Sequence, residues 1–70
     1  MTVAEDLYFI LTTFMDGIDS VNSLNKYYTD NKQAVATLRS LSTRHYDQLI
    51  NDFKTRKKEI LNEEEAITND

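Results

Sequence analysis

His45 is the only histidine of this 70-residue chain and the side chain best suited to proton transfer near neutral pH. A catalytic histidine needs a nucleophile and an orienting acid close by in space, and Ser42 and Asp47 are near it in sequence. On a helix, the offset of two residues places Asp47 on a different face. We therefore expect no catalytic residue and no enzyme. His45 is predicted to be half-buried and hydrogen-bonded, with a pH-sensitive contact as the alternative.

The acidic side chains and the composition offer no metal site. Glu63, Glu64 and Glu65 are consecutive, so they fan out around a helix and do not converge on one cation. The chain has no cysteine, which excludes thiolate ligation of zinc and disulfides alike. It contains no glycine-rich phosphate loop and no nucleophile elbow. These features predict a protein without a metal, a cofactor or a small-molecule substrate.

One basic run is a candidate contact for an anion, and it consists of Lys54, Arg56, Lys57 and Lys58. Charge is distributed in blocks: residues 1–30 carry five acids and one base, 32–58 seven bases and two acids, and 59–70 five acids. The net charge of −4 argues against nucleic-acid binding as the main role. We expect the run to be a solvated helix end whose charges the following acids screen.

Apolar residues at alternating spacings of four and three dominate the first part of the chain. This spacing is typical of a helix whose a and d positions pack lengthwise against other helices. Near residues 7–11, Tyr8, Phe9 and Ile10 make the helix apolar on every side. So short a chain cannot cover this collar alone, which indicates a partner. The stripe consists of Leu7, Leu11, Phe14, Ile18, Val21 and Tyr28, with Asn25 as its one polar member.

Local signals predict a first helix over about residues 3–28. Thr2 and Glu5 form a capping box at its start. The stripe keeps its phase across Gly17, which favours a continuous helix. The alternative is a break after Gly17, with Asp19 or Ser20 capping a new helix.

A tight turn at Thr29–Asn31 precedes a second predicted helix over about residues 31–62, with Asp30 as its cap. A turn this short makes the two helices antiparallel neighbours. Ser42 and Thr43 are its weak point, where a break would yield a third helix. The apolar side of this helix carries Val35, Leu38, Leu41, His45, Leu49, Phe53 and Ile60.

The sequence thus predicts an all-α fold: an antiparallel hairpin of two long helices that completes a dimeric four-helix bundle, with a three-helix bundle as the alternative. Residues 1–62 form the helical association domain and 63–70 an acidic, disordered tail. The predicted interface consists of Leu7, Phe9, Leu11, Phe14, Ile18, Val21, Leu38, Leu49 and Phe53.

The function expected from these features is a non-enzymatic helical module for oligomerisation or docking. Its partner is a second copy of itself or another helical protein, and it serves as a small subunit or as the N-terminal interaction domain of a larger assembly. The alternative is a small regulatory protein that binds a protein or nucleic acid through the basic helix end. Acids and threonines interrupt every apolar stretch, so no membrane span is expected. We expect an intracellular protein, either cytoplasmic or nuclear.

Overall fold

The structure, a computed structural model, describes the backbone of residues 2–68 and the side chains of residues 2–63. It contains four helices: α1 (Val3–Asp16), α2 (Val21–Asp30), α3 (Lys32–Leu41) and α4 (Thr43–Thr68). No strand occurs between residues 2 and 68, so the prediction of an all-α protein is confirmed. The predicted pair of long helices is wrong, because each of them is divided into two.

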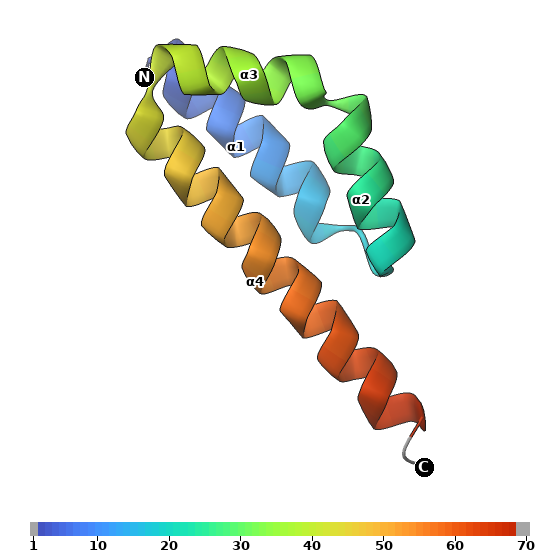
Figure 1. The fold of residues 1–70 in the computed structure, drawn as a ribbon. Helices are drawn as coiled ribbons and strands as arrows, with labels where there is room; N and C mark the ends of the chain where they lie inside the picture. The colour runs from blue at the N-terminus through green and yellow to red at the C-terminus, as the bar shows by residue number, and fades with distance from the viewer. Residues whose placement is uncertain (1, 69–70) are drawn as a thin grey trace.

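α1 and α4 lie side by side and run in the same direction, while α2 turns back and α3 crosses the end where both begin (Figure 1). The contacts between residues far apart in the sequence agree with this parallel arrangement of α1 and α4. Tyr8 of α1 meets Asp52 of α4, and Arg56, one turn further along α4, reaches Ile18, just after α1. The two helices that pack along their length are therefore parallel neighbours and not the two arms of an antiparallel hairpin.

The first predicted helix breaks at residues 17–20. The Gly17 N–H donates to the Phe14 carbonyl at 3.3 Å, which closes the last turn of α1. Ser20 then takes an extended conformation, and its hydroxyl accepts a hydrogen bond from the Ser23 N–H at 3.1 Å. Ser20 is thus the N-cap of α2, as the alternative interpretation of this segment expected. The break lets α2 fold back, so that Leu24 becomes fully buried.

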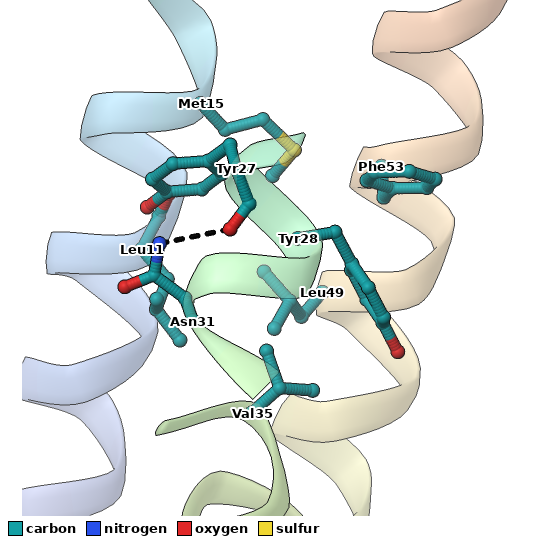
Figure 2. Close-up of a pocket in the computed structure, with 8 residues that line it drawn as sticks. All are labelled: Leu11, Met15, Tyr27, Tyr28, Asn31, Val35, Leu49 and Phe53. Carbon is teal, nitrogen blue, oxygen red and sulfur yellow. Dashed lines mark hydrogen bonds between the residues drawn. The ribbon is translucent and has the colours of Figure 1, made fainter. Parts of the chain in front are cut away.

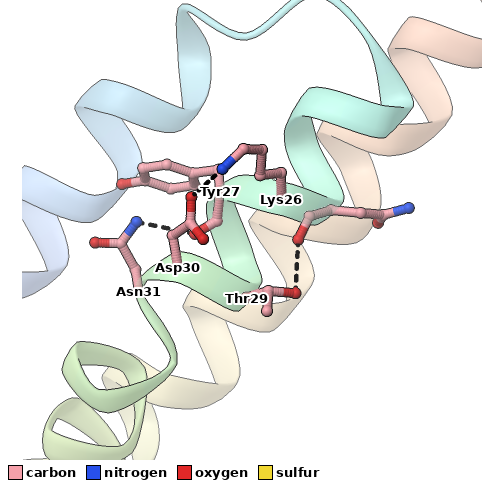
Figure 3. A network of polar contacts seen from close by, with 6 residues as sticks. Lys26, Tyr27, Thr29, Asp30 and Asn31 are labelled. Carbon is pink, nitrogen blue, oxygen red and sulfur yellow. Dashed lines mark hydrogen bonds and ion pairs between the residues drawn. The ribbon is translucent and has the colours of Figure 1, made fainter.

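The turn between α2 and α3 consists of a single residue, Asn31. The predicted cap, Asp30, is wrong: its carboxylate pairs with Lys26 at 3.0 Å instead (Figure 3). Asn31 occupies the cap position without a side-chain cap bond. Its Nδ2 instead donates to the Tyr27 carbonyl at 2.9 Å, which also accepts the Asn31 backbone N–H at 3.1 Å, so both groups of Asn31 bond the end of α2.

The second predicted helix breaks at Ser42. This residue is extended, and its hydroxyl accepts the His45 N–H at 3.3 Å, so α4 begins at Thr43. α4 continues to Thr68, beyond residue 62, where we had placed the end of the helical domain. Residues 69 and 70 of the predicted acidic tail lie outside the described residues.

All four helices contribute to one apolar core. On α1 the inward side carries Ala4, Leu11 and Met15, of which only Leu11 belongs to the predicted stripe. Phe14, which we had placed at the centre of that stripe, is 65% exposed. The C-terminal part of α4 projects beyond the other helices (Figure 1). The buried side chains are Ala4, Leu11, Met15, Leu24, Val35, Leu38, Leu49 and Ile60.

Replacing Leu49 by Ala should lower the free energy of unfolding by roughly 2–5 kcal/mol, because it leaves a cavity in the core. The matched variant Phe14→Ala should change it by less than about 0.5 kcal/mol in the monomer, since that ring is mostly exposed. Urea unfolding at low protein concentration measures both values. Equal losses for the two variants would place Phe14 in the core and contradict this fold.

Candidate functional site

The Ser42–His45 pair has a structural role at the start of α4. The Ser42 Oγ lies 2.7 Å from His45 Nδ1 and also accepts the His45 N–H as a helix cap. The imidazole meets the Tyr8 ring edge-on, with centroids 5.8 Å apart. Asp47 is exposed, and within residues 2–63 it makes no hydrogen bond to His45. The three residues considered for catalysis are therefore not brought together.

Two polar contacts join α1 to α4. The Tyr8 hydroxyl donates to the Asp52 carboxylate at the centre of the contact. At the lower end, the Arg56 guanidinium donates two hydrogen bonds to the Ile18 carbonyl, at 3.1 Å from Nε and 2.7 Å from Nη2. That carbonyl belongs to the break after α1 and has no helical donor of its own, so Arg56 satisfies it. Both contacts lie in an open cleft between α1 and α4.

The pKa of Tyr8 is raised to about 12, first by burial and then by its hydrogen bond to the negatively charged Asp52, with a smaller effect from Asp16. The pKa of Tyr27 is raised by burial, and its hydroxyl donates to the Leu11 carbonyl at 2.9 Å. Burial and the neighbouring Tyr46 raise the pKa of Tyr28. All three shifts keep the phenols neutral, which suits hydrogen-bond donors in a helix contact and not nucleophiles.

A small apolar cavity lies where the four helices meet (Figure 2). Its volume of about 10 Å³ is room for one water molecule at most. On one side, the Tyr28 and Phe53 rings pack against each other with centroids 5.0 Å apart. The cavity is therefore a packing defect of the core and too small to bind a substrate. Its lining consists of Leu11, Met15, Tyr27, Tyr28, Asn31, Val35, Leu49 and Phe53.

The predicted basic run does not present a single surface. Arg56 points toward the break after α1, where it holds Ile18. Lys54 and Lys58 are exposed and Lys57 is half-buried. The run therefore offers an outside anion two exposed lysines and one half-buried lysine, and not four cations.

The nine predicted interface residues separate into three groups. Leu11, Leu38 and Leu49 are buried in the core of the single chain. Phe9 and Phe14 are exposed on α1. The remaining four are half-buried against the core, and they are Leu7, Ile18, Val21 and Phe53.

Exposed apolar side chains are concentrated on α1. Among the described side chains, four of the six large exposed hydrophobic ones belong to this helix: Val3, Phe9, Ile10 and Phe14. Val3, Ile10 and Phe14, together with half-buried Leu7, follow the spacing four, three, four, which places them in one row. We call these four residues the outer seam of α1.

Sequence reasoning identifies only Leu7 and Phe14 of the outer seam, because α1 carries two overlapping rows. The inner row, Ala4, Leu11 and Met15, is displaced by one residue from the seam and obeys the same spacing. Val3, Ile10 and Met15 were consequently absent from the predicted interface. Their spacing was visible in the sequence, but it does not say which row faces the core.

No cluster of three or more His, Asp or Glu side chains within the described residues is arranged to hold a metal ion. None of the described helices combines the length and apolar character that crossing a membrane requires. No protein-family model matches the sequence, and no curated protein or solved structure does.

Tyr8 should make the protein less stable at alkaline pH. Its pKa is raised above the ordinary value of 10.0 to about 12 in the folded chain. The folded state therefore keeps this proton when the unfolded state has lost it, so the stabilisation is complete below pH 10 and is lost as the pH rises to about 12. Denaturant midpoints across this range should fall less steeply for Tyr8→Phe. Identical slopes would show that the Tyr8–Asp52 contact is absent in solution.

Arg56→Gln should lower the free energy of unfolding by about 1–3 kcal/mol, because it leaves the Ile18 carbonyl without its charged donor. Arg56→Lys should recover part of the loss, since one ammonium cannot reproduce both guanidinium bonds. Lys58→Gln, an exposed neighbour in the same run, is the control and should stay within about 0.5 kcal/mol. Equal effects of Arg56→Gln and Lys58→Gln in urea unfolding would contradict the capping role.

Proposed function

We propose that this chain is a non-enzymatic helical interaction module that associates through the outer seam of α1. The observation that carries the proposal is the row formed by Val3, Ile10 and Phe14, which are 69%, 51% and 65% exposed. Small monomers rarely leave a contiguous apolar row in water, because covering it stabilises a complex by about 25 cal/mol for each Å² removed from water.

The polar side chains support the same proposal, because the fold already uses them. Tyr8 and Asp52 hold α1 against α4, Arg56 satisfies the break after α1, and the Ser42–His45 pair caps α4. Catalysis requires an acid, a base and a nucleophile that converge on one point. These groups do not form such a set.

Binding of a macromolecule through the basic run is less favoured. A phosphate backbone is held by several cations that act together, and affinity then falls steeply with salt. Here Arg56 is directed inward to the Ile18 carbonyl, which leaves Lys54 and Lys58 as the exposed cations of the run.

Photo-crosslinking tests the proposed function directly. A benzoylphenylalanine placed at Phe14, in the outer seam, should form a protein–protein adduct on irradiation, in purified protein or in cell extract. The matched control carries the same group at Asn51, which is exposed on α4. Adducts that form equally from both positions, or from neither, would contradict association through the seam.

A further inference from the structure

We infer that the outer seam of α1 binds the outer seam of a second copy of this chain, in antiparallel orientation. The inference rests on the proposed function and names the partner for that surface. Its geometrical basis is the row of Val3, Leu7, Ile10 and Phe14, which one further step of three extends to Gly17. Five positions at four, three, four and three residues are the a and d positions of a paired helix.

Gly17 is the observation that points to a close neighbour. Its φ of −85° is open to any residue, so its conformation does not require glycine. A Cβ built there would meet only the Phe14 carbonyl oxygen, at an ordinary contact distance of 3.7 Å. The single chain therefore has no steric need for glycine at this position. A helix packed against the seam does have one, because a missing side chain lets it approach closely.

In one antiparallel register, a side chain of the second copy fills the space that Gly17 leaves open. When Ile10 of each copy lies opposite Phe14 of the other, Leu7 falls opposite Gly17. The central contacts then pair an aliphatic side chain with an aromatic one, and the outer contacts pair a leucine with a glycine. Each chain contributes the same surface twice, as a two-fold symmetric dimer requires.

The acidic residues of α1 favour the antiparallel orientation. The described α1 has three acids, Glu5, Asp6 and Asp16, and no base. Glu5 and Asp6 lie in its first turn, so a parallel pair would gather four carboxylates at one end. The antiparallel register separates the two acidic ends by roughly 20 Å at 1.5 Å per residue, and it opposes the helix dipoles. Asp16 lines the cleft between α1 and α4, away from the seam.

The exposed surface is consistent with a small dimer contact. The chain exposes 5164 Å², whereas a compact monomer of 8.2 kDa is expected to expose about 4,500 Å². Part of the difference is the projecting end of α4 (Figure 1). The whole difference, counted on both chains, is roughly 1,300 Å², which lies at the lower end of the areas that stable interfaces bury.

Solution mass and seam variants test the inference on the full chain. Sedimentation equilibrium should give an average mass that rises with protein concentration from the 8.2 kDa of one chain toward twice that value. Ile10→Glu should weaken the dimer by roughly 100-fold, because it places a charge in an apolar contact, yet keep the helical content. Asn51→Glu, on exposed α4, is the control and should leave the mass unchanged. Gly17→Leu should weaken the dimer by roughly tenfold without destabilising the monomer.

Cysteine pairing tests the orientation, since the chain has no cysteine of its own. A mixture of the Leu7→Cys and Gly17→Cys chains should form a disulfide between copies on mild oxidation. Val3→Cys alone should not, because the antiparallel register keeps the two Val3 positions about 27 Å apart and a disulfide needs Cα atoms within about 7 Å.

Each alternative outcome has a distinct meaning. A rapid Val3→Cys disulfide would overturn the antiparallel arrangement. A wild-type chain that stays monomeric at high concentration would overturn self-association, and a Phe14-specific adduct with another protein in extract would then leave the proposed function intact. A monomeric chain that forms no such adduct would contradict both the self-association and the proposed function.

Discussion

The structure depends on the break at residues 17–20, where α1 ends and the chain turns back. Stopping a helix leaves carbonyl and N–H groups without partners, and such groups are costly in a part-buried position. Here the Ser20 hydroxyl accepts an N–H of α2, while Arg56 of α4 donates to the Ile18 carbonyl. With its polar groups satisfied, α2 can bring Leu24 into the core, and the same arginine joins the turn to α4.

This break also determines how much of α1 can be covered. Because the chain folds back after only 14 residues of helix, a four-helix unit of this size surrounds α1 on its inner side alone. Ala4, Leu11 and Met15 are buried there, whereas Val3, Ile10 and Phe14 stay in contact with water. The fold therefore covers the apolar side chains of α1 on one side of the helix and leaves those on the other side exposed to water.

The polar residues that were considered as candidate site residues make contacts that stabilise the fold of the single chain. His45 and Ser42 begin α4, Tyr8 and Asp52 hold the centre of the α1–α4 contact, and Arg56 completes its end. The contacts of Tyr8 and Arg56 join residues 44 and 38 positions apart, so they could not be inferred from local spacing. Tyr8 donates to a carboxylate and Arg56 to a backbone carbonyl, both of the same chain.

Local sequence determined the helical class, the start of α1 and the turn at residue 31, because these depend on neighbours within four residues. Thr2 and Glu5 form the predicted capping box, with the Thr2 hydroxyl accepting the Glu5 N–H at 3.1 Å. A cap at Ser20 and a break near Ser42 and Thr43 are among the alternatives that the sequence leaves open, and the structure places the second cap at Ser42. Whether such a serine stops a helix is decided by tertiary contacts, since Leu24 and Leu38 reach the core only if it does.

Which row of α1 faces inward was decided by the tertiary structure alone. Two rows with the same spacing lie one residue apart on α1, and the sequence does not distinguish which of them is buried. Only the positions of α3 and α4 determine that Met15 is buried and Phe14 is not. The parallel course of α1 and α4 has the same origin, because it follows from the breaks at residues 17–20 and Ser42 together with the turn at Asn31 (Figure 1). Helical periodicity shows which residues share a face of a helix, and tertiary packing determines which face is buried.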